Sequence, residues 1–271
     1  MHPTIHELTT YLETIAPSHY QEDYDNSGLL VGDPQTEITG VMISLDATEG
    51  VIDEAVAKGC NLVVSHHPII FRGLKRLTGR NYVERVVIKA IREGVALYAI
   101  HTNLDNVLRN GVNGKIAEKL GLENTRILAQ KPLLKNGLPA PDPEVGSGVI
   151  GALPVSMTEY DFLQLLKDTM KVGCIKHTPL RGRMIQSIAV CGGAGGFLLP
   201  RAIAAGADFF VTADYKYHEF FDADGQIVIA DIGHYESEQF TIDLLYEIIS
   251  KKYSNFAPYC TSVNTNPVHY F

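Results

Sequence analysis

The sequence predicts an α/β protein with a largely parallel β-sheet. Short apolar runs typical of buried strands alternate with amphipathic helical segments along most of the chain. Glycines follow several of the helical segments, as expected where a helix ends in a left-handed cap. The chain has 271 residues, 45% of them hydrophobic and 20% charged, so it can form one large domain or two small ones.

The first half opens with a helix and continues as alternating strands and helices. Thr4 and Glu7 fit a capping box, and the apolar residues Ile5, Leu8 and Leu12 share one helical face. After a loop rich in Gly and Asp, continuous apolar runs predict strands, and the segments between them predict helices that each end close to a glycine. The expected strands are 38–45, 62–65 and 95–100, and the expected helices are 49–57, 82–93 and 114–120.

A proline-rich stretch divides the chain. Residues 131–146 contain four prolines and two glycines without periodicity, which is typical of a linker. We therefore expect an N-terminal α/β half over 1–130, a linker over 131–146 without an inserted domain, and a C-terminal α/β half over 147–271. In the second half the same patterns predict helices at 160–170, 197–205 and 235–251, and strands at 186–190, 208–212 and 226–231.

The two halves resemble each other in sequence. The segment KGCNLVVSHHPIIF aligns with AGADFFVTADYKYH, and VALYAIHTNLD aligns with QIVIADIGHYESE. Each alignment brings an apolar strand and a polar, histidine-bearing strand exit into register. Duplication of one α/β unit explains this pattern, and chance similarity between α/β units is the alternative.

Composition argues against several classes of function. A net charge of -8 disfavours an extended nucleic-acid interface, which needs a basic face. A local basic patch at Lys75, Arg76 and Arg80 is the exception, for which a solvated loop is the simpler interpretation. The four scattered cysteines predict neither a disulfide framework nor a zinc ribbon. No apolar run is long enough to span a bilayer and the N-terminus lacks signal-peptide features, so we expect a cytoplasmic protein.

Side chains that bind metals gather where the predicted strands end. In α/β sheets, ligands bind beyond the carboxyl ends of the strands. The adjacent His66 and His67 follow one strand and precede Pro68, which favours an extended backbone at His67. Two neighbouring histidines at a strand exit can each ligate one ion of a metal pair. An isolated His-His pair is more often part of a polar loop than of a ligand set, so its position at a strand exit is what favours a metal site.

Three further residues complete the predicted ligand set. His234 and Glu238 lie four residues apart at the start of a helix, so both side chains face the same way. Asp105 follows another strand exit, four residues after His101. Imidazoles combined with carboxylates suit Zn, Mn or Fe better than Ca or Mg. The alternatives are an ordinary turn at Asp105 and a solvated helix start at His234.

The glycine-rich segment CGGAGG lies between a predicted strand and a predicted helix. Backbone amides in such a turn can bind a phosphate, but the segment lacks the full dinucleotide fingerprint and has no P-loop lysine. A tight turn with close helix packing is the alternative.

The motifs SHHPIIF, HTNLD and GHYESEQF together resemble the NIF-three-like family, whose members are GTP cyclohydrolase I type two homologues. DNSGLLVG, TADYKYHEFFDADG and NTNPVHYF also match, so the resemblance covers nearly the whole chain. It implies a duplicated α/β fold with a dinuclear metal site between two similar halves and a toroidal homohexamer. By this resemblance the ligands of the two divalent ions are His66, His67, Asp105, His234 and Glu238, with Glu238 as the bridge.

The expected activity is metal-dependent hydrolysis, in which paired ions activate water. The resemblance implies GTP as substrate, a nucleotide whose purine ring opens when water attacks C8. His101 and His218 are the candidate catalytic proton carriers, because each lies near a strand exit without being needed as a ligand. The alternatives are a non-enzymatic oligomeric metal-binding or regulatory scaffold and a metal-dependent phosphoesterase.

Overall fold

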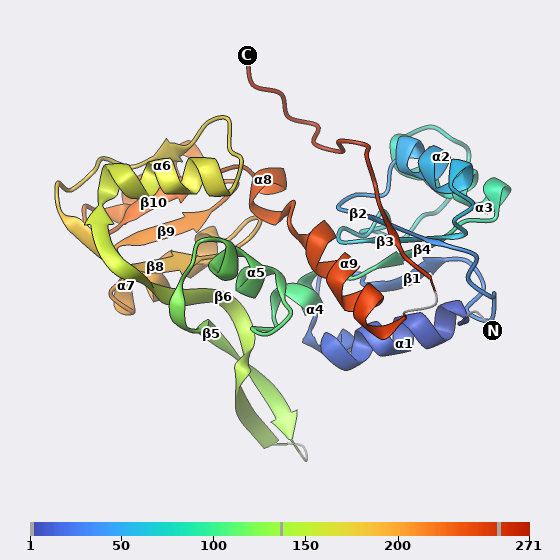
Figure 1. The fold of residues 1–271 in the computed structure, drawn as a ribbon, viewed down its shortest axis with the longest axis horizontal. Helices are drawn as coiled ribbons and strands as arrows, with labels where there is room; N and C mark the ends of the chain where they lie inside the picture. The colour runs from blue at the N-terminus through green and yellow to red at the C-terminus, as the bar shows by residue number, and fades with distance from the viewer. Residues whose placement is uncertain (1–2, 136–137, 254–255) are drawn as a thin grey trace. The chain divides into compact units, whose positions relative to one another are not determined.

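The computed structural model describes the backbone of residues 3–135, 138–253 and 256–271, and their side chains except those of 133–141 (Figure 1). The chain forms two compact units, each described here by itself. Unit 1 comprises residues 1–104 and 241–267, and unit 2 comprises residues 105–240 and 268–271. Both units combine a β-sheet with helices, so the predicted α/β class is confirmed.

Unit 1 is built on a sheet with the strand order β1-β4-β3-β2-β11. β2 (Val41–Ser44), β3 (Leu62–Ser65) and β4 (Ala96–Ala99) are parallel, so their carboxyl ends lie at one edge of the sheet. β1 (Gly28–Val31) pairs with β4 in the antiparallel sense, and β11 (Tyr259–Cys260) pairs with β2 in the parallel sense. All residues of β2, β3 and β4 are buried, as expected of a sheet covered on both faces.

Helices cover this sheet from two sides (Figure 1). α2 (Glu49–Ala57) and α3 (Tyr82–Glu93) pack in one hydrophobic cluster with Met42, Val63 and Leu97 of the central strands. Because neighbouring residues of a strand face opposite ways, this cluster uses one face of the sheet. The burial of that face explains the apolar stripe along each of the two helices.

The second pair of helices in unit 1 comes from the two ends of its sequence. α1 (Ile5–Ile15) and α9 (Thr241–Lys252) lie side by side (Figure 1), and the ring of Tyr11 packs edge-on against that of Tyr253, with 6.2 Å between centroids. The predicted capping box of α1 is confirmed, because the Thr4 and Glu7 side chains each accept a hydrogen bond from the other residue's backbone N–H.

Unit 2 contains a second sheet, with the strand order β5-β6-β8-β9-β10-β7. β8 (Met184–Val190), β9 (Phe209–Thr212) and β10 (Val228–Asp231) are parallel, and β7 (Lys176–His177) pairs with β10 in the antiparallel sense. As in unit 1, the carboxyl ends of three parallel strands therefore lie at one edge.

Two helices use the opposite faces of β9. On α6 (Glu159–Thr169), the ring of Phe162 packs against Phe209, with 4.9 Å between centroids. Phe210 belongs to the hydrophobic cluster formed with α7 (Leu199–Ala204). Adjacent phenylalanines of a strand point to opposite faces, so this sheet is also covered on both sides.

The segment expected to be a linker is instead part of a β-hairpin. β5 (Glu123–Lys135) and β6 (Leu138–Thr158) are antiparallel, and their pairing continues through Pro132 with Pro141. β6 pairs with β8 only at residues 149–158, and Val145 forms an isolated bridge with Val107. Among the described strand pairings, Pro139 and Pro141 of β6 have β5 as their only partner strand. Prolines are tolerated there because a missing N–H can face the side without a partner strand. The change from unit 1 to unit 2 falls at Leu104 and not in this segment.

The helix expected over 235–251 is also interrupted. It forms α8 (His234–Glu238) and α9 (Thr241–Lys252), and the chain passes from unit 2 to unit 1 after Phe240. The buried residues of α8 are Glu236, Ser237 and Glu238, whereas α9 buries Leu244, Leu245, Ile248 and Ile249, so the apolar stripe of the expected helix belongs to α9 alone. In the part of the chain that the structure describes, no helix has the length and hydropathy of a membrane span.

Candidate metal centre

Three histidine rings meet at the carboxyl edge of the unit 1 sheet. His66 and His67 follow β3, and His101 follows β4 by two residues, while Ser65 and Ala99 at the ends of these strands are paired. The ring centroids lie 4.9 Å apart for His66 and His67, 5.2 Å for His66 and His101, and 5.3 Å for His67 and His101. Ligand nitrogens of the three rings all lie within 4.8 Å of one another, a spacing that can hold a metal ion.

Each of these rings has its Nδ1 atom in a hydrogen bond. His66 Nδ1 donates to the carbonyl of Ile100 at 2.9 Å, and a carbonyl can only accept, which assigns the proton to Nδ1. His67 Nδ1 lies 2.8 Å from Asp46 Oδ1, and His101 Nδ1 lies 2.8 Å from Asp25 Oδ1. The neutral ring in each case carries its lone pair on Nε2, the tautomer that metal-binding histidines adopt when a neighbouring acceptor orients them.

The carboxylates that orient the rings are themselves held in place. Burial alone would raise the pKa of Asp25, but hydrogen bonds from His101, from Thr102 and from the backbone of Asn26 outweigh it and hold the pKa well below its ordinary value. Burial likewise opposes ionisation of Asp46, and hydrogen bonds from His67 and from Thr265 at 2.6 Å lower its pKa. Both groups are therefore charged acceptors near neutral pH.

Asp25 and Asp46 were not predicted as site residues. Asp46 stands two residues after β2, the neighbour of β3, and Asp25 stands three residues before β1, the neighbour of β4. Their positions next to strand ends are the signal that the sequence offered. Neither position is next to a histidine in the sequence, so the pattern of histidines at strand exits does not include these two acids.

Unit 2 repeats this arrangement around His234. The residue opens α8, and its Nδ1 lies 2.7 Å from Asp214 Oδ2, while its Nε2 lies 3.2 Å from Glu238 Oε2. The predicted i, i+4 pair is thus brought together on one helix face. Asp214, which adopts a positive φ of 60° two residues after β9, was not predicted. Glu238 is only 3% exposed, so its carboxylate lies in the interior of the protein.

Asp105 is the last residue of α4 (Thr102–Asp105), and its backbone carbonyl accepts a hydrogen bond from Asn113 Nδ2 at 3.0 Å. The thiol of Cys191 lies close to the carboxylates of Asp105 and Glu238. Burial raises its pKa first, and the charges of Asp105 and Glu238 raise it further. The two predicted carboxylate ligands therefore lie in one region of unit 2 together with the buried, neutral thiol of Cys191.

The glycine-rich turn after β8 packs directly against these ligands. A Cβ atom on Gly193, whose φ is +62°, would lie 2.5 Å from Glu238 Oε1 and 3.2 Å from His234 Cε1. The amide N–H of Gly192 donates to Asn113 Oδ1, and that of Gly193 donates to Ser237 Oγ, each at 2.9 Å. Since these amides already have side-chain acceptors, the turn fits the close-packing interpretation and not the phosphate-binding one.

The second predicted proton carrier lies on the surface. His218 is exposed on the 3₁₀ helix η3 (Tyr217–Ala223), and its ring contacts that of Tyr217, with 5.2 Å between centroids. Among the contacts that the structure describes, none joins His218 to a predicted ligand. His101, by contrast, lies within the histidine cluster of unit 1.

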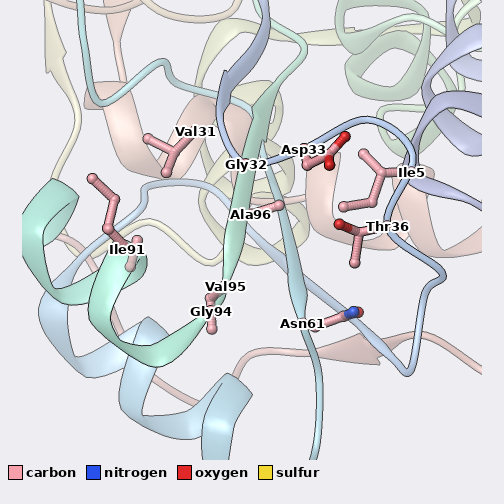
Figure 2. A pocket seen from close by; sticks show the side chains of 11 residues that line it. Ile5, Val31, Gly32, Asp33, Thr36, Asn61, Ile91, Gly94, Val95 and Ala96 are labelled. Carbon is pink, nitrogen blue, oxygen red and sulfur yellow. The ribbon is translucent and has the colours of Figure 1, made fainter.

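A cavity of about 240 Å³ in unit 1 is separate from this centre (Figure 2). It is lined by Ile5, Val31, Asn61 and Ala96, among others. Asn61 precedes β3 and Ala96 opens β4, so the cavity lies at the amino ends of the strands, whereas the histidines follow the carboxyl ends.

The chain has many relatives of known sequence and structure. A protein of Clostridium acetobutylicum named GTP cyclohydrolase 1 type 2 homolog is 33% identical over 235 residues, covering 86% of this chain and 85% of the relative. A Staphylococcus epidermidis protein of the same name is 28% identical over an alignment of 366 residues, covering 98% of this chain and 99% of the relative. Because this chain has 271 residues, the relative contains a long stretch that this chain lacks.

Several solved structures superpose on this chain over nearly its whole length. A hypothetical protein of Staphylococcus aureus superposes with a TM-score of 0.91 at 30% identity, over 100% of both chains. Reduced HcgD from Methanocaldococcus jannaschii superposes with a TM-score of 0.73 at 27% identity, over 95% of this chain and 96% of that one. The family model described as Duf34/NIF3 (NGG1p interacting factor 3) matches residues 3–267. The chain therefore belongs to the Duf34/NIF3 family.

Proposed function

We propose that this protein is a metal-dependent hydrolase that holds two divalent ions. The ligands in this proposal are His66, His67, Asp105, His234 and Glu238. The observation that carries it is the hydrogen bonding of the histidines, each of which has Nδ1 bound to an acceptor and its lone pair on Nε2. Connectivity supports it as well, because His101 of unit 1 and Asp105 of unit 2 are only four residues apart in the chain.

The donor set indicates which ions fit. Neutral imidazoles combined with buried carboxylates match Zn, Mn or Fe, whereas Ca and Mg sites are built mainly from oxygen ligands. Glu238 is the proposed bridging ligand, since its carboxylate is buried and lies beside His234. The glycine turn supports this role because Gly193 leaves room for the Glu238 carboxylate where any side chain would displace it.

The residues of the chain divide the remaining work. When bound, the two metal ions would supply Lewis-acid activation of water and of an electrophilic carbon or phosphorus centre. His101 is the proposed proton acceptor, because the charged Asp25 holds its Nδ1–H and stabilises the imidazolium that forms on protonation. His218 is proposed only as a second, exposed proton carrier.

GTP is the proposed substrate, on the strength of the name that the relatives carry. Hydrolytic attack at purine C8 would open the imidazole ring of the base. The proposal also includes a cytoplasmic location, which is supported by the four cysteines all being free thiols.

Metal content per chain is the deciding measurement, made on protein purified without chelator. We expect about two ions of Zn, Mn or Fe per chain, and loss of metal with a folded chain in His67→Ala and Glu238→Ala. Glu247→Ala, which removes an exposed acid on α9, is the matched control and should keep its metal. One ion or none in the wild type would contradict the paired site, and turnover of GTP that survives metal removal would contradict the hydrolase.

The proposal also includes a duplicated fold and self-association. The strand orders β1-β4-β3-β2 and β7-β10-β9-β8 match, with an antiparallel strand beside the third parallel one in each unit, and this supports a duplicated fold. Exposed aromatic side chains at Tyr217 and Phe221, whose rings lie 5.7 Å apart, support self-association, which we propose to be a toroidal hexamer. Light scattering of the purified protein measures the number of chains directly.

The scaffold and the phosphoesterase remain the alternative functions. A scaffold would bind metal without turning over GTP or a phosphate ester. A phosphoesterase would release inorganic phosphate from a nucleotide and leave the purine ring intact, so the ultraviolet spectrum of the base distinguishes it from ring opening.

A further inference from the structure

The loop between β3 and α3 is the most basic segment of an acidic protein. Residues 71–80 read FRGLKRLTGR and contain four cations and no acid, whereas the whole chain carries a net charge of -8. Arg72, Lys75, Arg76 and Arg80 are all exposed. A local excess of positive charge on an otherwise acidic surface attracts anions to that one place.

Both ends of this loop are held in place by unit 1. At its beginning the ring of Phe71 packs against that of His101, with 5.5 Å between centroids, and the carbonyl of Ile70 accepts a hydrogen bond from Asn26 Nδ2 at 2.6 Å. At its end the carboxylate of Glu84 accepts hydrogen bonds from the Thr78 amide at 2.8 Å and from the Arg80 amide at 3.1 Å. The loop therefore has fixed ends, and its first residue, Phe71, contacts the histidine cluster.

The cations of the loop differ from the others nearby. On the adjacent helices, Arg85 lies 3.0 Å from Glu49 and Lys89 forms an ion pair with Asp53. In the described part of the chain, no acidic side chain forms an ion pair with Arg72, Lys75 or Arg76. Acids of α2 thus neutralise Arg85 and Lys89 of α3, whereas Arg72, Lys75 and Arg76 of the loop are available to an external anion.

We propose that the loop 71–80 binds the phosphate groups of a small phosphorylated substrate. This inference rests on the proposed function, because it assigns the loop to the substrate of the same centre. Phe71 contacts His101 and is followed directly by Arg72, so phosphates held by the loop keep the rest of the molecule beside the histidines. Arginine forks and lysine ammonium groups both bind phosphate oxygens well. Four cations in one short loop suit a phosphate chain, whereas a nucleic acid requires a longer basic face.

The test is the binding of inorganic triphosphate to the metal-containing protein by calorimetry, with Mg²⁺ in excess to limit chelation of the bound metal. The variant combines Arg72→Gln, Lys75→Gln and Arg76→Gln, three exposed changes that leave the core intact. The control combines Arg85→Gln and Lys89→Gln, which remove exposed or part-exposed cations that have acidic partners. We expect the loop variant to bind triphosphate at least about tenfold more weakly, from three exposed charge contacts of modest strength each. The control should bind like the wild type.

Metal content and GTP turnover of the same proteins separate this inference from the proposed function. Loop-dependent triphosphate binding in a wild type that does not turn over GTP would support the loop and contradict the hydrolase. Equal triphosphate affinity in the wild type and the loop variant would overturn the inference, whatever the turnover. A loop variant that loses affinity for a single-stranded oligonucleotide but not for triphosphate would also overturn it, in favour of a nucleic-acid ligand.

Discussion

Asp46 offers the sharpest test of how the centre is organised, because it lies outside the ligand set. Its Oδ1 is 2.8 Å from His67 Nδ1, and its Oδ2 accepts a hydrogen bond from Thr265 at 2.6 Å. In Asp46→Asn an amide replaces the charged acceptor while the shape is kept. Either the amide oxygen accepts a weaker bond from His67, or the amide NH₂ faces the ring and favours the tautomer with its proton on Nε2, which cannot ligate.

Loss of such a supporting carboxylate lowers metal affinity by about 10–100-fold, or roughly 1.4–2.7 kcal/mol. We expect Asp46→Asn to show this loss in competition with a chromophoric chelator, together with little change in circular dichroism. Asp53→Asn, which removes the same charge from the exposed end of an ion pair with Lys89, should leave metal affinity unchanged. Equal affinities for wild type and Asp46→Asn would refute the argument that the hydrogen bond at Nδ1 prepares His67 as a ligand.

Three other outcomes follow from the structure. Gly193→Ala should lose metal, since its Cβ would meet the Glu238 carboxylate. Gly206 also has a positive φ, but a Cβ there would face open space. Gly206→Ala should therefore show only the backbone cost of about 1 kcal/mol in urea unfolding. His101→Gln should lower turnover while retaining part of the metal, because it removes the proposed proton acceptor and not a proposed ligand. Hydrogen bonds from Thr261, Lys58 and Ser262 outweigh the effect of burial and lower the pKa of Glu54 to about 2. The stability that Glu54 contributes should therefore be lost as the pH falls from about 4.5 towards 2. Glu54→Gln should remove that part of the pH dependence of unfolding.

Much of the fold could be predicted because its elements are local patterns. The buried strands β2, β3 and β4 are continuous apolar runs, and the helices between them carry an apolar stripe and end near a glycine. The short antiparallel strands β1 and β7 carry no such pattern, since each is defined by pairing with a strand distant in the sequence. The β5–β6 hairpin was missed because prolines normally argue against a strand, and Pro139 and Pro141 are tolerated where β5 is their only partner among the described strand pairings.

The candidate site divides in the same way. His66, His67, His234 and Glu238 were recognisable because strand exits and i, i+4 spacing are local features. The carboxylates that orient the rings lie 21 residues from His67, 76 residues from His101 and 20 residues from His234. No periodicity within an element connects residues at such separations, so these partners emerged only when the sheets placed their strands side by side.

One rule nevertheless relates the histidine sites to their acids. In unit 1 the acid Asp46 follows β2 and orients the histidine that follows the neighbouring strand β3. In unit 2 the acid Asp214 follows β9 and orients the histidine that follows the neighbouring strand β10. The sequence alignment of the two halves places His67 opposite Asp214, so the position of a proposed ligand in one unit corresponds to that of an acid bonded to a histidine in the other. If the halves arose by duplication, each retained the pairing of a histidine with an acid on adjacent strand exits but shifted it by one strand. Such a shift keeps the hydrogen bond at Nδ1, which orients an imidazole ligand, while the proposed donors differ between the units: two imidazoles in unit 1, and one imidazole with two carboxylates in unit 2.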